Sequence, residues 1–141
     1  MSSPSNPPRI DGLLETSLYA RDLERTAAFY RELFGLKPLV DTPRLVAFEI
    51  AARSVLLVFQ AGATEGDVVD PRGKIPGHDG DGRLHLALSI AKEDLDAWRQ
   101  RLLERGIEIV GEYRWPRGGV SLYIRDPDDA LVELATPGLW W

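Results

Sequence analysis

Residues 83–90 read Arg-Leu-His-Leu-Ala-Leu-Ser-Ile and alternate between apolar and small or polar side chains. Alternation with a period of two predicts a strand that presents one face to an apolar core. The other face carries a single imidazole, that of His85, among small residues. Such a face suits the wall of a cavity better than bulk solvent.

Two further stretches repeat this pattern. Residues 13–20 alternate in the same way and present Glu15 on their polar face, and residues 130–135 do so around Glu133. Three predicted strands therefore each carry one side chain that is able to bind a metal. If Glu15, His85 and Glu133 converge, they predict a site for a divalent metal ion.

Composition favours an ordinary globular protein. The 141 residues suffice for one core, and the net charge of −5 disfavours nucleic acid or an anionic membrane as a partner. A sequence without cysteine excludes thiolate metal sites and cysteine nucleophiles. No apolar run reaches the roughly 18 residues of a membrane-spanning helix, and residues 1–10, rich in Ser and Pro, predict a disordered leader rather than a secretory signal. We therefore predict a cytoplasmic protein.

The chain repeats one order of elements. Asp22 as N-cap and Gly35 as C-terminal stop bound a predicted helix over residues 23–34. Strands are predicted near residues 13–20, 37–41, 45–50 and 54–60 in the first half. The second half has a strand at 83–90, a helix over 93–105, and extended segments at 107–110, 120–124 and 130–135. Each half thus reads β-α-β-β-β, which indicates two copies of one unit. We place module one at 11–62, a linker or loop at 63–82, and module two at 83–141.

The stretch from Ala61 to Gly82 is rich in Gly, Asp and Pro and shows no periodicity. Such a stretch is either a linker, which we favour, or an active-site lid. His78 within it is then either an ordinary loop residue or a lid residue that contacts substrate. Residues 115–119 predict a tight turn, in which Trp115 either walls a pocket or anchors a hairpin.

Several motifs together resemble one superfamily, that of glyoxalases, bleomycin-resistance proteins and extradiol dioxygenases, known as the vicinal oxygen chelate fold. The motifs are Leu18-Tyr19-Ala20-Arg21-Asp22-Leu23-Glu24-Arg25, Ala28-Phe29-Tyr30 with Gly35-Leu36, His85-Leu86-Ala87-Leu88, and Tyr123-Ile124-Arg125-Asp126-Pro127-Asp128 leading to Leu131-Val132-Glu133-Leu134. The resemblance spans residues 13–137. It implies an α+β fold whose two βαβββ modules form a U-shaped mixed β-sheet cup around a divalent metal.

The resemblance also implies where the ligands lie, on the first and last strands of each module. The first-strand positions are Glu15, where histidine is usual in the superfamily, and His85. The last-strand position of module two is Glu133. In module one this position falls at Leu56 or Leu57, and neither binds metal. The substrate-pocket candidates are Tyr19, Leu57, His78, Trp115 and Tyr123.

Two carboxylates and one imidazole suit Zn, Ni, Co, Mn or Fe without selecting among them. Three protein ligands leave positions open for water or substrate, and Glu15 or Glu133 could release the ion and act as a catalytic base. Dioxygenase chemistry is disfavoured, because its usual site has two histidines and one carboxylate. Metal-free interpretations stay open: Glu15 bonded to Ser17 or Tyr19, His85 as a satisfied cavity residue, and Glu133 paired with Arg125 or another arginine.

Two classes of function follow. The first is a metal-dependent enzyme of lyase, isomerase or transferase type, whose metal chelates two adjacent oxygens of a small substrate. The second is a metal-free, bleomycin-resistance-like protein that sequesters a small aromatic or cationic molecule. Apolar bulk at Trp140 and Trp141 predicts a symmetric homodimer, and the resemblance implies the same, because sites in this superfamily are often completed between chains. Glu15, His85 and Glu133 are expected to point into one cavity, with Glu15 supplied either by the same chain or by the partner.

Overall fold

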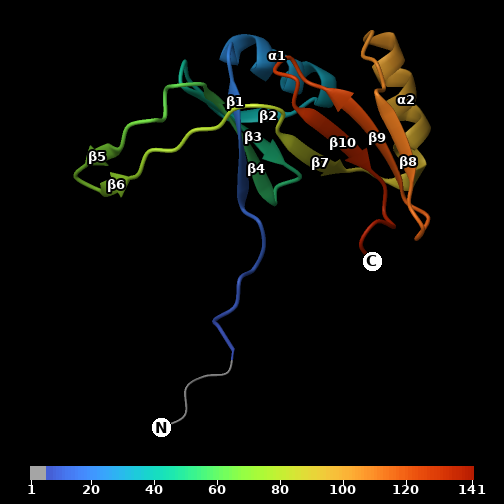
Figure 1. The fold of residues 1–141 in the computed structure, drawn as a ribbon, viewed down its shortest axis with the longest axis horizontal. Coiled ribbons are helices and arrows are strands. Elements are labelled where there is room, and N and C mark those ends of the chain that lie inside the picture. Colours follow the sequence, from blue (N-terminus) through green and yellow to red (C-terminus); the bar gives the residue numbers. More distant parts are fainter. Residues whose placement is uncertain (1–5) are drawn as a thin grey trace.

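The computed structural model describes residues 6–141. Its elements form two four-stranded sheets, a two-stranded hairpin and two α-helices within that range (Figure 1). Residues 6–14 are exposed and lead away from the body of the molecule. The first part of the predicted leader, residues 1–5, lies outside the described residues. Within residues 6–141, neither helix has the length and apolarity that crossing a membrane requires.

The first module contains five elements in the predicted order. They are β1 (Glu15–Ala20), α1 (Leu23–Phe34), β2 (Lys37–Asp41), β3 (Leu45–Ile50) and β4 (Ser54–Gln60). The strand order is β1-β4-β3-β2, with β1 parallel to β4 and the other pairs antiparallel. A parallel pair inside an otherwise antiparallel sheet makes the sheet mixed, as predicted.

The second module repeats this topology. Its elements are β7 (His85–Ser89), the 3₁₀ helix η1 (Lys92–Asp94), α2 (Leu95–Glu104), β8 (Gly111–Arg114), β9 (Val120–Arg125) and β10 (Leu131–Ala135). The order β7-β10-β9-β8 again places the first strand parallel to the last. The predicted α+β fold of two βαβββ modules is confirmed.

Two boundaries of the second module differ from the prediction. The helix predicted over 93–105 is a 3₁₀ turn followed by α2, and strand pairing after it begins at β8 rather than over 107–110. Ile107 and Ile109 alternate because they pack against the core, not because they pair with another strand. The first bond to the neighbouring strand comes from the amide of Val110, which donates to the carbonyl of Tyr123 at 2.8 Å.

The stretch between the modules carries structure that the sequence analysis missed. β5 (Val68–Asp70) and β6 (Gly73–Ile75) form an antiparallel hairpin that projects from the body (Figure 1). The side chain of Asp70 accepts a bond from the amide of Arg72 at 2.7 Å, and Gly73 adopts a positive φ of 139°. The prediction of a stretch without regular structure was therefore wrong for residues 68–75.

Helix α1 forms where its sequence signals place it. The side chain of Asp22 accepts the amide of Arg25 at 3.3 Å, and Gly35 ends the helix in the left-handed conformation at φ 64°. The buried face consists of residues that recur at helical spacing: Leu23, Thr26, Ala27, Tyr30 and Leu33.

One apolar cluster joins the two modules. It contains Tyr30 and Leu33 from the first module and Leu102, Ile124 and Val132 from the second. Helix α1 lies over the junction of the modules in Figure 1. The shared core therefore packs against one face of each sheet, and the opposite faces are available for other contacts.

Candidate functional site

The register of the second sheet builds one side of the candidate site. Glu133 in β10 pairs with Ala87 in β7 and with Tyr123 in β9, and Leu131 pairs with His85. Directly paired residues share a face of a sheet. We call the surface that carries His85, Ser121, Tyr123 and Glu133 the open face of the second sheet, because the alternate residues of these strands pack into the core.

His85 and Glu133 meet on this open face. The Nε2 atom of His85 lies 3.3 Å from Oε1 of Glu133, and the side chains are 50% and 7% exposed. The Nδ1 atom of His85 lies 2.9 Å from the carbonyl oxygen of Leu131. A carbonyl only accepts, so this contact places a proton on Nδ1. In a neutral imidazole the lone pair is then on Nε2, the atom nearest the carboxylate.

This pair fits a divalent metal. Ligands that each lie about 2.1 Å from one ion are about 3.0–3.4 Å apart at octahedral to tetrahedral angles. The separation of 3.3 Å between Nε2 of His85 and Oε1 of Glu133 falls in that range. A backbone carbonyl behind the imidazole is also the arrangement that metal-ligating histidines usually have. A cation between the lone pair and the carboxylate would satisfy both atoms.

The second oxygen of Glu133 is held from behind by neighbouring side chains. Oε2 accepts a short hydrogen bond from Oγ of Ser121, and Oγ in turn accepts from Nε1 of Trp115 at 2.8 Å. Trp115 also opens the predicted tight turn, since its amide donates to the carbonyl of Gly119 at 2.8 Å. Trp115 thus anchors the hairpin, and its role as a pocket wall stays a prediction. Sequence reasoning missed Ser121, although its alternation with Tyr123 places both on the same face.

Tyr123 and Trp115 give this face an aromatic border. The ring of Tyr123 lies 6.5 Å from that of His85, and the ring of Tyr113 meets Trp115 edge-on at 4.7 Å. Burial raises the pKa of the Tyr123 phenol above its ordinary value, and the negative charge of Glu133 adds to the rise. Tyr123 therefore stays a neutral phenol, able to donate a hydrogen bond, at physiological pH.

Arg125 does not pair with Glu133, as one metal-free interpretation of that glutamate required. Its Nε atom lies 3.7 Å from Oδ1 of Asp129, and a terminal nitrogen donates to the carbonyl of Asp129 at 3.2 Å. Glu133 thus has the imidazole of His85, rather than an arginine, as its neighbour on the open face.

Glu15 lies in the other sheet. It is exposed and pairs with Val55 of β4, in the position that His85 occupies beside Leu131 in the second module. Among residues 6–141, no three His, Asp or Glu side chains gather closely enough to hold one ion. One chain therefore brings His85 and Glu133 together but does not bring Glu15 to them.

The internal repeat also resolves the choice between Leu56 and Leu57. Ser17 pairs with Leu57 as Ala87 pairs with Glu133, so Leu57 is the counterpart of Glu133. Leu56 is buried in the core. Module one thus has a possible metal ligand, Glu15, at its first-strand position and an apolar residue, Leu57, at its last-strand position.

The remaining pocket candidates gather on the first sheet. The hydroxyl of Tyr19 lies 2.7 Å from Nδ1 of His78, whose ring meets Phe59 edge-on at 4.8 Å. Burial raises the pKa of Tyr19, and the charge of Asp79 adds to the rise. A Cβ at Gly80 would come within 2.4 Å of the Tyr19 ring, so the loop needs glycine there. We call the face of the first sheet that carries Glu15, Ser17 and Tyr19 its open face, because Leu18 and Ala20, which alternate with them, are buried. The loop that carries His78 thus covers one end of this open face.

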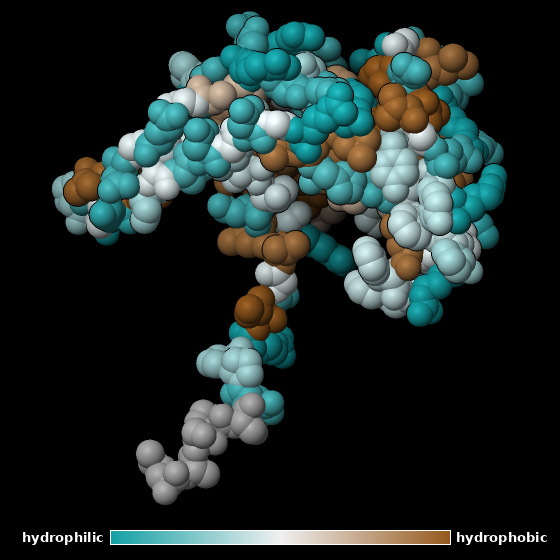
Figure 2. Space-filling model, in the orientation of Figure 1, coloured by the Kyte–Doolittle hydropathy of each residue, from teal (hydrophilic) through white to brown (hydrophobic). Residues whose placement is uncertain are grey.

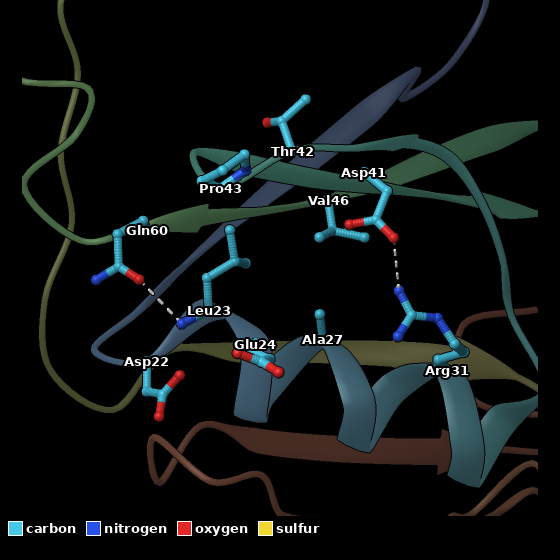
Figure 3. A pocket seen from close by; sticks show the side chains of 10 residues that line it. All are labelled: Asp22, Leu23, Glu24, Ala27, Arg31, Asp41, Thr42, Pro43, Val46 and Gln60. Carbon is cyan, nitrogen blue, oxygen red and sulfur yellow. Dashed lines mark hydrogen bonds and ion pairs between the residues drawn. The ribbon is translucent and has the colours of Figure 1, made fainter.

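One cavity lies beside these faces, and another lies on the helix side of the first sheet. The first, of about 290 Å³, lies between the edges of the two sheets, and its wall includes Glu15 and Ala87. The second, of about 590 Å³, opens beside the start of α1 (Figure 3). There Arg31 holds Asp41 at 3.2 Å and the amide of Leu23 donates to Gln60 at 3.0 Å. Among the described residues, the lining of this larger cavity contains none of the predicted site residues.

Comparison with known proteins gives consistent matches over nearly the whole chain. The model of the Glyoxalase/Bleomycin resistance protein/Dioxygenase superfamily matches residues 12–134. The metallothiol transferase FosB of Bacillus licheniformis is 30% identical over 129 residues, which cover 91% of this chain and 77% of that protein. The fosfomycin resistance protein FosX of Listeria monocytogenes is 28% identical and covers 89% of each chain. The crystal structure of lactoylglutathione lyase from Agrobacterium tumefaciens has a TM-score of 0.85 at 36% identity, covering 96% of this chain and 98% of that one.

Proposed function

Because this chain belongs to the glyoxalase/bleomycin resistance protein/dioxygenase superfamily, we propose that it is a divalent-metal-dependent enzyme of lyase, isomerase or transferase type. Its substrate is a small oxygen-rich molecule that presents two adjacent oxygens to the metal. The observation that carries the proposal is the His85–Glu133 pair, whose 3.3 Å separation suits two ligands of one ion.

The chain's own residues would divide the work as follows. Nε2 of His85 and Oε1 of Glu133 would hold the ion, which would be Zn, Ni, Co, Mn or Fe, and Glu15 of the partner subunit would complete the set. When bound, the ion would supply a positive charge that favours negative charge on the substrate oxygens. Glu15 is the freer of the two candidate bases, because one oxygen of Glu133 is already committed to Ser121.

The pocket would be assembled from both open faces. Trp115 and Tyr123 border the metal ligands on the second sheet, while Tyr19 and Leu57 would come from the first sheet of the partner and His78 from the loop that covers it. Aromatic rings around a few convergent polar groups are typical of small-molecule sites.

Two of the relatives support an enzyme over a passive binder. The name of FosB states a metallothiol transferase, and the Agrobacterium structure is that of a lyase. Both lie within the reaction classes proposed here. The comparison supports the reaction class proposed for this chain, and the substrates of those proteins are not carried over to it.

Elemental analysis after stripping and reloading with each candidate metal tests the proposal. Wild type should bind about one ion per chain, and His85→Ala should bind none while keeping its circular dichroism melt, because His85 lies on an open face rather than in the core. His78→Ala is the matched control, because it removes the only other histidine of the sequence, and it should keep the metal.

If the wild-type protein takes up none of the five metals at micromolar concentration, the proposal of a metal-dependent enzyme is contradicted. The metal-free alternative would then stand, namely a protein that sequesters a small aromatic or cationic molecule. The ring border of Trp115 and Tyr123 and the net charge of −5 suit such a ligand.

A further inference from the structure

We infer that Trp115 and Ser121 are positioning residues, which form a hydrogen-bond chain that aims one oxygen of Glu133 at the metal. The inference rests on the proposed function and deepens it. Neither residue needs to touch the ion. Their effect is exerted through the carboxylate of Glu133, whose Oε2 atom they hold and whose Oε1 atom they leave directed at His85.

The direction of the chain is fixed by chemistry. An indole N–H can only donate, so the 2.8 Å bond between Trp115 and Ser121 must run from Nε1 to Oγ. The single hydroxyl proton of Ser121 is then free to point at Oε2 of Glu133, with which Oγ makes a short contact. Bonds in such a chain polarise and strengthen one another, and a bond to an ionised carboxylate is stronger than a neutral one.

Because it is buried, the hydrogen-bond chain restrains the carboxylate of Glu133. Ser121 is fully buried and Glu133 is 5% exposed, so water does not compete for Oγ or Oε2. The indole is itself held, by the turn that starts at Trp115 and by the edge-on ring of Tyr113 at 4.7 Å. The carboxylate therefore has one oxygen locked in place and one presented to the open face.

The internal repeat shows that a βαβββ module folds without this hydrogen-bond chain. In module one, Leu57 stands at the position of Glu133, and Leu45 stands at that of Ser121, since Leu45 pairs with Phe59 as Ser121 pairs with Ala135. The same backbone register thus folds with apolar side chains at both positions. Hydroxyl and indole occur together only in the module that has the ligand pair, which ties them to the ligand rather than to the fold.

The test is Co²⁺ binding to the full-length protein, followed by calorimetry and by the visible absorption spectrum of the bound ion. Outer partners of metal ligands typically contribute 10–100-fold to affinity. We expect Ser121→Ala to weaken Co²⁺ binding by about that factor and to change the spectrum, because Glu133 becomes free to rotate or to bind through both oxygens. Trp115→Phe should weaken binding less, since Ser121 keeps its own proton.

Non-additivity distinguishes a chain from two separate effects. Because Trp115 acts through Ser121, the double variant should bind Co²⁺ no more weakly than Ser121→Ala alone. Ser121→Thr, which keeps the hydroxyl, should restore most of the affinity and the wild-type spectrum. A merely structural role for Ser121 would predict no such rescue, because threonine adds a methyl group to a fully buried position.

The matched controls are Ser89→Ala, an exposed serine on the same strand as His85, and Trp98→Phe, a tryptophan on α2 that packs against Phe34. Both should bind Co²⁺ as wild type does. If wild type binds Co²⁺ and Ser121→Ala and Trp115→Phe bind it equally well with unchanged spectra, the positioning role is overturned and the proposed function stands. If wild type binds neither Co²⁺ nor the other metals, both are overturned. Should Ser121→Ala not fold, Trp115→Phe and Ser121→Thr decide between these outcomes.

Discussion

Two carboxylates in the turn between β9 and β10 show how neighbouring atoms decide the behaviour of a residue. Asp126 is buried and accepts bonds from the hydroxyl of Tyr30 at 2.7 Å and from the amides of Asp128 and Ala130 at 2.8 and 2.9 Å. Burial nevertheless prevails and raises the pKa of Asp126. Burial likewise raises the pKa of Tyr30, together with the charge of Asp126.

Asp128, two residues on, behaves in the opposite way. Its oxygens accept from the hydroxyl of Thr26 at 2.5 Å and from the amide and Nε of Arg21 at 2.9 and 3.2 Å. Burial acts to raise the pKa of Asp128, but the bonds from Thr26 and the charged Arg21 outweigh it and lower the pKa below its ordinary value. The ionised form of Asp128 therefore fastens α1 of the first module to the second.

The stability that Asp128 contributes should depend on pH. Because its pKa is lower in the folded state, the contribution is present above the unfolded pKa near 4 and is lost as pH falls through the folded value. We expect Asp128→Asn to lower the free energy of unfolding by about 1–2 kcal/mol at pH 7, and the difference from wild type to shrink steadily below about pH 4. Urea unfolding at several pH values measures this. Asp11→Asn, at an 80% exposed side chain, is the control. A difference that stays constant from pH 7 to pH 2 would contradict the role of the charge.

At the level of elements, the ends of α1 could be predicted from the sequence because each depends on one residue, Asp22 at the start and Gly35 at the end. Gly35 ends the helix at φ 64°, where a side chain is disfavoured by its own backbone. A Cβ built there meets no atom within 4 Å. The need for glycine at this position is therefore one of backbone conformation alone.

We expect Gly35→Ala to destabilise the protein by about 1 kcal/mol, measured as a shift in the urea midpoint with an unchanged slope. Gly66→Ala is the matched control. Gly66 also has open space around its Cα, but its φ is not in the positive range, so alanine should be neutral or slightly stabilising there. Equal effects at the two positions would show that the left-handed cap is not what matters at Gly35.

Sequence reasoning found the elements whose apolar residues are regularly spaced or densely grouped. β1 and β7 alternate in burial and α1 and α2 carry stripes at helical spacing, whereas β10 was found although four of its five residues are buried. The hairpin of β5 and β6 was missed because its strands have three residues each and most of their side chains are exposed, so no alternation marks them. Ile107 and Ile109 gave a misleading alternation, since core packing imitates strand pairing.

The residues of the candidate site also differ in how far the sequence predicts them. His85 and Glu133 were predictable because each is the one metal-competent side chain on an alternating strand, and the repeat places both on the same face. Ser121 was not, because a serine on a strand has no distinctive pattern and its role depends on contacts with Trp115 and Glu133 that only the fold creates. The place of Glu15 relative to this pair is not set by the register of one chain.

At the scale of the whole molecule, apolar side chains remain exposed near both ends of the chain. Figure 2 shows brown, hydrophobic surface along the extended segment that precedes β1. Ile10, Leu13 and Leu14 there are 87%, 90% and 69% exposed, and Trp140 and Trp141 at the other end are 76% and 93% exposed. Exposed apolar surface of this kind often marks an interface. We therefore expect a symmetric homodimer, and sedimentation showing only monomer at tens of micromolar would count against it.

If the partner chain supplies Glu15, mixed dimers should regain metal sites. A dimer of one Glu15→Ala chain and one His85→Ala chain contains one site with all three ligands and one site that lacks both mutated ligands. We expect such heterodimers, isolated by two different affinity tags, to bind about one ion per dimer, while each homodimer binds weakly or not at all. Heterodimers of His85→Ala with Glu133→Ala are the control and should regain none, because these two ligands come from the same chain. Glu15 acting within its own chain would leave both mixtures without metal.

Arg101 has a thermodynamic consequence. From α2 its guanidinium donates to the carbonyls of Leu33 and Glu32, at 2.7 and 2.9 Å, and so caps the last turn of α1 with a side chain from the other module. Melting of the second module would remove this cap from α1, and melting of either module would expose part of the shared core. On heating, the duplicated halves should lose structure in a single heat-absorption peak, with a calorimetric enthalpy equal to the van't Hoff value. Two resolved peaks would mean that each half melts by itself.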